Sequence, residues 1–270
     1  MPSACLLVSH GSRDARPRIA VEQLANLVRQ RLENQRPLGI SPNWLSSNVG
    51  KCDRQKHKRS RGIASEPICP LVGCAALELT PMPLHESIKQ FARRAKAEGN
   101  TKVQILPLFL LPGVHVKEDI PSAVKLAQEA IGEQIPIQLQ PHLGSNPGLK
   151  QLLAKEFQCF STPTRILLSH GSRRVGANEA IEAIASELKA IAAYWSVSPS
   201  LSAQVEALVA AEKQEIAIVP YFLFQGGITE AIATQVKELQ LKFPHVQLLL
   251  GKPLGASAEL ADLVVEGVDK

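Results

Sequence analysis

Two histidines and a glutamate stand at positions where they could hold a metal ion. His10 directly follows a short apolar run, His115 lies just past another, and Glu78 ends a third. If these runs are parallel strands of one sheet, their carboxyl ends meet at a single edge, where open α/β sheets bind their ligands. Two imidazoles and a carboxylate at such an edge suit a borderline divalent metal ion.

The loop that carries His10, with the sequence Ser-His-Gly-Ser-Arg, permits two other chemistries. Glycine and hydroxyl residues after a strand can cradle a phosphate through backbone N–H groups, but neither G-x-x-x-x-G-K-[ST] nor G-x-G-x-x-G occurs here. Ser9 or Ser12 acting as a nucleophile with His10 would need an orienting group and an oxyanion hole, and the G-x-S-x-G elbow is absent. The pattern therefore favours a metal site.

This histidine loop occurs twice in the chain. Residues 6–13, Leu-Leu-Val-Ser-His-Gly-Ser-Arg, return at 166–173 as Ile-Leu-Leu-Ser-His-Gly-Ser-Arg. Two further segments are repeated in the same order. Residues 107–113 are repeated at 220–226, and Leu143-Gly144 is repeated as Leu254-Gly255. Three elements repeated in one order indicate a duplicated domain. We expect an N-terminal domain over 1–160 that carries the active site, and its duplicate over 161–270.

Of the three candidate site positions, the second copy keeps only the first, as His170. Alignment of the two halves places His115 opposite Ile228, and Glu78 opposite the aromatic pair 194–195. A duplicate that keeps the fold but loses two of three polar groups is expected to form a supporting wall. The working cleft is then built mainly by the first half.

Short runs rich in Val, Ile and Leu alternate with amphipathic stretches along the whole chain, a pattern typical of a parallel sheet covered by helices on both faces. The predicted fold class is therefore α/β. The expected strands lie at 5–8, 72–77, 103–109 and 136–139 in the first half, and at 165–168, 194–198, 216–222 and 246–250 in the second. In the second half, helices are expected near 178–193 and 229–241.

The formal net charge of +5 is confined to one segment. Residues 51–61 contain six basic residues and one acidic residue, so the rest of the chain is formally neutral. The segment lies within 35–70, where no sustained period occurs, and we predict a loop insertion there. The basic run is typical of a solvated loop, and without interleaved aromatic residues it does not favour nucleic-acid binding.

The five cysteines of this 270-residue chain form no C-x-x-C pair, and their odd number favours reduced thiols over a disulfide framework. No apolar run approaches the roughly 18 residues that a membrane helix needs, and the chain does not begin like a signal peptide. These features predict a soluble, cytoplasmic protein.

The sequence resembles the class II tetrapyrrole chelatases, in particular the sirohydrochlorin chelatases of the CbiX and SirB type. The resemblance is carried by residues 7–14, by Leu-Glu-Leu at 77–79 and by the long segment 106–121, and it covers nearly the whole chain apart from 35–70. It implies two tandem chelatase-like domains, each with a four-stranded parallel sheet flanked by helices.

This resemblance implies a lyase that inserts Co²⁺ or Fe²⁺ into sirohydrochlorin, in cobalamin or siroheme biosynthesis. By the same implication, His10 and His115 bind the incoming metal and take part in proton removal, and Glu78 assists them. Sirohydrochlorin is a polycarboxylate, so cationic side chains near the cleft are expected to clamp it. The candidates for this role are Arg13, Lys117 and Arg173.

The expected partners are sirohydrochlorin and the divalent metal ion, with no nucleic acid and no membrane. No cofactor is expected beyond the substrate metal, because the clustered cysteines of relatives that carry an iron–sulfur cluster are absent. These residues do not distinguish cobalt from iron, since both ions accept nitrogen and oxygen ligands. The alternative function is a non-catalytic metal or tetrapyrrole carrier on the same fold.

Overall fold

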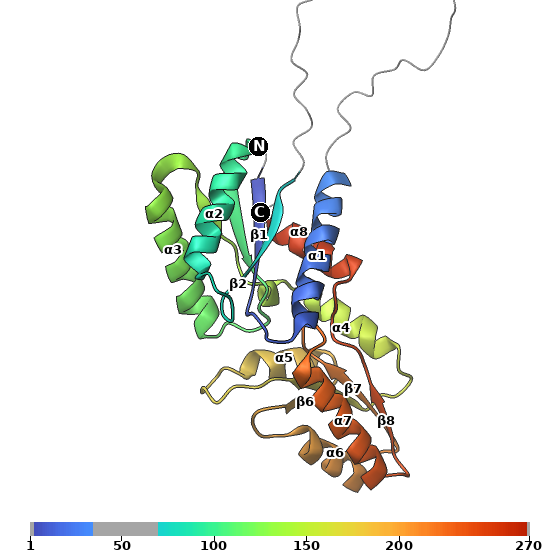
Figure 1. Ribbon diagram of the computed structural model, residues 1–270. Coiled ribbons are helices and arrows are strands. Elements are labelled where there is room, and N and C mark those ends of the chain that lie inside the picture. The colour runs from blue at the N-terminus through green and yellow to red at the C-terminus, as the bar shows by residue number, and fades with distance from the viewer. Residues whose placement is uncertain (1–2, 35–69, 269–270) are drawn as a thin grey trace, which may run out of the picture.

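The computed structural model describes residues 3–34 and 70–268, which form two four-stranded parallel sheets with helices on their faces (Figure 1). The first sheet has the order β2-β1-β3-β4 and the second β6-β5-β7-β8, so the duplicated arrangement expected from the sequence is confirmed. The first four strands are β1 (Ser3–Ser9), β2 (Val72–Ala76), β3 (Lys102–Pro107) and β4 (Ile137–Leu139). The others are β5 (Arg165–Ser169), β6 (Ile191–Tyr194), β7 (Glu215–Pro220) and β8 (Gln247–Leu250).

Eight α-helices connect and cover these strands in the described part of the chain. They are α1 (Ala15–Asn34), α2 (Leu84–Ala97), α3 (Ile120–Ile131), α4 (Gly148–Gln158), α5 (Glu179–Glu187), α6 (Leu201–Ala210), α7 (Gly227–Lys242) and α8 (Ala258–Val268). A π-helix, η1 (His115–Asp119), leads into α3, and short 3₁₀ turns occur at η2 (Gly132–Gln134) and η3 (Leu143–Ser145). None of the helices in the described ranges is long and apolar enough to cross a bilayer. The expected insertion at 35–70 and its basic run lie, apart from Pro70, outside the described residues.

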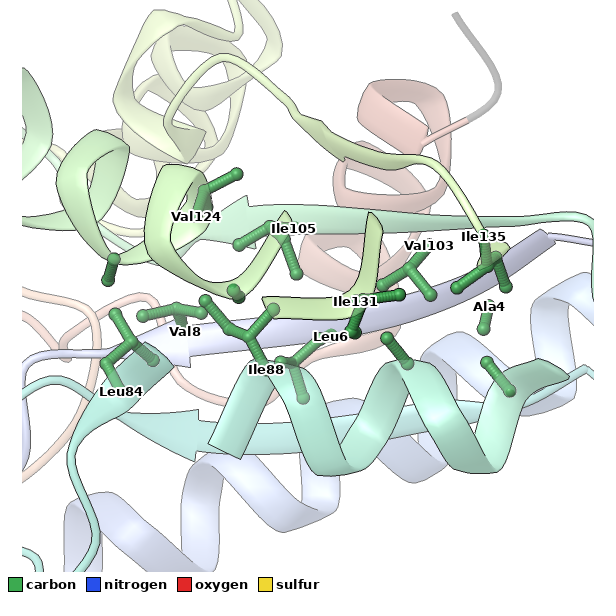
Figure 2. Close-up of a cluster of buried hydrophobic side chains, with 14 of the residues drawn as sticks. Ala4, Leu6, Val8, Leu84, Ile88, Val103, Ile105, Val124, Ile131 and Ile135 are labelled. Atoms are coloured by element: carbon green, nitrogen blue, oxygen red, sulfur yellow. The ribbon is translucent and has the colours of Figure 1, made fainter. Parts of the chain in front are cut away.

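The first sheet is buried on both faces because successive side chains of a strand point in opposite directions. Along β1, Ala4, Leu6 and Val8 pack beneath α2 and α3 in one apolar cluster, which Figure 2 shows in close-up. The alternate residues Cys5 and Leu7 pack on the other face, in a cluster that contains side chains of α1 and α8. This two-sided burial holds the carboxyl end of β1 rigidly in place.

Each sheet is completed by a helix from the other half of the chain. Helix α8, at the end of the described chain, contributes Val264 and Val268 to the cluster around β1, and the side chain of Gln104 in β3 donates a hydrogen bond to the carbonyl of Val268. Helix α4, which follows the first sheet in sequence, places Phe157 against Leu167 in the second sheet. Figure 1 shows α8 beside α1, at the first sheet. The packing therefore crosses the boundary at residue 160.

The predicted position of the second strand of the duplicate is wrong. The sequence pattern predicts a helix near 178–193 followed by a strand at 194–198. In the structure, α5 ends at Glu187 and β6 spans Ile191–Tyr194. The helix ends early because Lys189 adopts a left-handed conformation, with φ of 53°, and the N–H of Ala190 bonds back to the carbonyl of Ala185 at 2.8 Å. Glycine usually marks such a helix end, and a lysine gives no comparable signal in the sequence.

Candidate metal centre

The structure brings together the three residues that the sequence suggests as metal ligands. His10, Glu78 and His115 each offer a ligand atom, and these atoms all lie within 4.8 Å of one another. The two imidazole rings meet edge to face, with their centroids 4.9 Å apart. Glu78 Oε1 lies 4.0 Å from His115 Nε2, and both side chains are partly open to solvent. The placement of two imidazoles and a carboxylate at one point fits a small cation.

Sheet topology explains why residues so distant in sequence converge. β1 and β3 are neighbours in the sheet, but the chain leaves β1 toward β2 on one side and leaves β3 toward β4 on the other. The loops that follow β1, β2 and β3 meet at this switch point, the usual ligand-binding position of an open α/β sheet. The N–H of Glu78 donates to the carbonyl of His10 at 2.9 Å, which ties two of the three loops together directly.

Gly11 is required for this close approach of the loops. Its φ of +101° is unfavourable for any residue with a side chain, and a Cβ added there would lie 2.1 Å from the carbonyl oxygen of Glu78. A glycine at this position therefore lets the backbone that carries His10 pass directly against the backbone that carries Glu78.

Gly11→Ala is expected to weaken Co²⁺ binding at the candidate site by about tenfold or more, because it forces apart the loops that carry His10 and Glu78. Gly113→Ala is the matched control, since a Cβ there meets no atom within 4 Å. The measurement for both variants is the affinity of the protein for Co²⁺. Equal behaviour of the two would contradict the role given to the Gly11 contact.

His115 is the first residue of the π-helix η1 and does not lie in an irregular loop. The wide turn has a local cause in Pro121, which has no N–H to donate to the carbonyl of Lys117 and whose ring would crowd it. The chain instead forms the longer bond from the N–H of Ile120 to the carbonyl of His115. Such π turns often occur at functional sites.

Asp119 is a site residue that the sequence analysis does not single out. Its Oδ2 lies 2.7 Å from Nδ1 of His115, on the side of the ring away from the Glu78 contact at Nε2. The four-residue spacing on a helical turn is the signal that could have suggested this pair. Phe109 is a second such residue, with its ring centroid 6.2 Å from that of His10 and 6.1 Å from that of His115.

A cavity of about 510 Å³ adjoins His10. Most of its wall comes from the first half, including Val21 and Leu108, and the second half adds Leu223 and Phe224. The lining is mainly apolar. The cavity therefore offers a surface against which a flat, apolar ligand can lie, with an imidazole at its edge.

Two ion pairs of Arg16 connect the histidine loop to the second half. Arg16 forms ion pairs with Asp14, in the loop after His10, and with Glu230 in the first turn of α7. Hydrogen bonds from the Arg16 side chain and backbone lower the pKa of Asp14 to about 2, so this carboxylate stays charged at neutral pH. The pair with Glu230 joins the two halves beside the cavity.

The three expected substrate clamps, Arg13, Lys117 and Arg173, are all exposed. None of them forms an ion pair with another residue in the part of the chain that the structure describes. Their charged groups are thus available to a ligand. The structure brings none of them into the His10, Glu78 and His115 cluster itself.

The second half has lost the cluster. Ser196, and not an aromatic residue as expected, takes the place of Glu78, because its N–H donates to the carbonyl of His170 as that of Glu78 does to His10. The Ser196 hydroxyl also donates to the carbonyl of His170, at 2.8 Å. Ile228, 39% exposed, lies near the start of α7. The second half therefore contributes cavity wall and not a second metal site, within the described residues.

Two four-stranded parallel sheets, with histidine and carboxylate side chains gathered at the carboxyl edge of the first, define a two-lobed α/β protein with a candidate metal centre. The sequence matches the CbiX family over residues 70–158 and 164–270, and the chain belongs to that family.

Curated relatives of this chain include a sirohydrochlorin cobaltochelatase and a sirohydrochlorin ferrochelatase, both from Priestia megaterium. The first is 24% identical over 189 residues, a match that covers 64% of this chain and 62% of the relative. The second is 23% identical over 191 residues, covering 66% of this chain and 71% of the relative. The match thus spans less than two thirds of the length of the cobaltochelatase.

The fold is also that of a solved structure, SirB from Bacillus subtilis with Fe³⁺. The TM-score is 0.69 at 20% sequence identity, and the superposition covers 100% of this chain and 95% of that one. At this identity the likeness establishes the fold.

Proposed function

We infer that this protein inserts a divalent metal ion, Co²⁺ or Fe²⁺, into sirohydrochlorin. The observation that carries the inference is the cluster of two imidazoles and a carboxylate, with ligand atoms within 4.8 Å of one another, beside an apolar cavity built by both halves. Membership of the CbiX family and the activities in the names of the two relatives support it. We assign the reaction to the cytoplasm.

The chemistry of insertion matches the residues available. The ion must lose its water ligands, and the ring must lose two N–H protons as its nitrogens bind the metal. A neutral imidazole has one lone pair, which can bind an ion or accept a proton near neutral pH. We assign both tasks to His10 and His115. Glu78, half exposed at 50%, offsets positive charge at the ion and passes the released protons to water.

The exposure of the candidate ligands favours an ion in transit over a permanently bound one. The side chains of His115 and Glu78 are 32% and 50% exposed, so an ion held between them stays within reach of solvent and of a second ligand. Such an ion can pass to the ring nitrogens without leaving the closed set of protein ligands that is typical of structural metal sites.

The cavity next to His10 supports a place for the macrocycle. Its volume of about 510 Å³ lies in the range of small-molecule sites, and its apolar wall suits the flat face of a tetrapyrrole. Because His10 belongs both to this wall and to the metal cluster, a ring resting there would present its nitrogens to the incoming ion.

Multiple turnover tests the proposed function. The protein is to be incubated without oxygen with an excess of sirohydrochlorin and either Co²⁺ or Fe²⁺, and the absorption of the ring followed with time. Repeated conversion per protein molecule is expected, and the ratio of the two rates identifies the preferred metal. Uptake that stops at one equivalent with both metals would show a carrier and contradict the enzymatic function.

Removal of the exposed arginines is expected to weaken binding of sirohydrochlorin specifically. Arg13→Ala and Arg173→Ala should each raise the KM for sirohydrochlorin by up to about tenfold, the loss of one charge-assisted hydrogen bond, with little change in the KM for the metal. Arg94→Ala is the control, because this arginine lies in the last turn of α2 and pairs with Glu98. An unchanged KM for sirohydrochlorin in both variants would remove these residues from the clamp.

A further inference from the structure

The carboxylate of Asp119 contacts Nδ1 of His115, whereas the other ring nitrogen, Nε2, faces Glu78. Oδ2 of Asp119 lies 2.7 Å from Nδ1, a short and well-formed hydrogen bond. An ionised carboxylate offers only acceptors, so the proton of this bond belongs to Nδ1 of the ring. The lone pair is then on Nε2, the nitrogen that faces Glu78 at 4.0 Å.

We propose that Asp119 is a positioning residue that fixes both the orientation and the tautomer of His115, so that Nε2 meets the incoming metal ion. The proposal rests on the proposed function in that the ion is the substrate. Histidine ligands commonly donate their second N–H to a carboxylate, which sets the ring in place before the metal arrives. Asp119 does not touch the ion in this arrangement and acts through His115 alone.

The backbone makes this pairing a built feature of the fold. His115 and Asp119 are the first and last residues of η1, which the N–H of Ile120 closes by bonding to the carbonyl of His115. Ile120, the first residue of α3, is itself fully buried in the apolar core. The turn that presents the pair is therefore anchored in the apolar core, although both side chains remain partly exposed, at 32% and 47%.

The two histidines of the cluster are held differently. The ring of His10 makes its hydrogen-bond contact with the carbonyl of its own neighbour, Gly11, at the long distance of 3.4 Å. That contact leaves the His10 ring freer to rotate than the His115 ring. In the duplicated half, Ile228 takes the place of His115 and the residue four positions later is Ile232, so ligand and supporting carboxylate are absent together. His115 thus serves as the fixed member of the pair.

Two substitutions of Asp119 separate its hydrogen bond from its charge. Asp119→Ala removes the acceptor and is expected to weaken Co²⁺ binding to the protein alone, and to slow insertion, by about 10–100-fold. Asp119→Asn keeps an acceptor oxygen, so the hydrogen bond to Nδ1 should remain. Because a neutral acceptor bonds more weakly, the Co²⁺ affinity and insertion rate of this variant should fall, but by no more than about threefold. Glu118→Ala removes a neighbouring carboxylate of η1 and serves as the control for net charge.

Nitrogen NMR of the His115 ring supplies a readout that needs no turnover. A proton on Nδ1 is expected in the unaltered protein and in Asp119→Asn, with a mixture of tautomers in Asp119→Ala. Unchanged tautomer and unchanged Co²⁺ affinity in Asp119→Ala would overturn the positioning role. A loss of Co²⁺ affinity in both Asp119→Asn and Glu118→Ala as large as that in Asp119→Ala would overturn it too, because net charge would then explain the effect. A failure of the proposed function would instead appear as absent turnover in the unaltered protein with the tautomer effect intact.

Discussion

Replacement of His115 or His10 by alanine is expected to lower the rate of metal insertion about 10³-fold, within the range that removal of a general acid–base group usually costs. In the proposed mechanism each ring supplies a metal ligand and a proton acceptor at the same point, and the other ring cannot do both at once. The fold should remain, because His10 is exposed and His115 is about one third exposed. The measurements are anaerobic insertion of Co²⁺ into sirohydrochlorin and the thermal midpoint of each variant.

His170→Ala is the matched control for His10→Ala. Both histidines directly follow an inner strand of their sheet, within the same five-residue sequence Ser-His-Gly-Ser-Arg. Among the residues that the structure describes, His170 belongs to no cluster of three candidate metal ligands, so its loss should cost less than about tenfold. A loss equal to that of His10→Ala would mean that both halves build the reaction centre. Full activity of His10→Ala would remove the metal centre from the mechanism.

Phe157→Ala is expected to lower the free energy of unfolding by about 3–5 kcal/mol, the cost of emptying a large buried aromatic site. Phe157 lies in α4, is fully buried, and packs in the core of the second sheet with Leu167 and Val219. Because α4 also contacts α8, which completes the first sheet, we expect both halves to unfold in one transition at a lower urea concentration. Far-ultraviolet circular dichroism in a urea titration measures this change.

Leu241→Ala provides the control for this experiment. Leu241 is a large apolar residue at the end of α7, but it is 82% exposed, so its truncation should change stability by less than about 0.5 kcal/mol. Two separate transitions, of which only one moves in Phe157→Ala, would show that the halves unfold independently despite the exchanged helices.

Much of the fold, and the three candidate metal ligands of the site, could be predicted from the sequence because they depend on local patterns. Apolar runs between amphipathic stretches indicate buried parallel strands, and residues just after such strands must gather at one edge. That rule alone placed His10, Glu78 and His115 together. The repeated histidine loop likewise indicated two copies of one sheet.

The remaining features depend on information that a local pattern does not contain. The apolar face of α8 predicts burial but not that its partner is the sheet at the other end of the chain. The end of α5 depends on a left-handed lysine, Lys189, where the usual signal is glycine. The role of Asp119 depends on a π turn that Pro121 favours and that changes which side chains meet.

The exchange of helices also has a consequence for synthesis on the ribosome. The strands of the first sheet emerge early, but one of its faces requires α8, whose residues are the last of the described chain to be made. Until then the apolar side chains around Leu7 lack part of their cover, and such surface invites association with other nascent chains. The amino-terminal half therefore cannot reach its finished structure until α8 has also been synthesised and has left the ribosome.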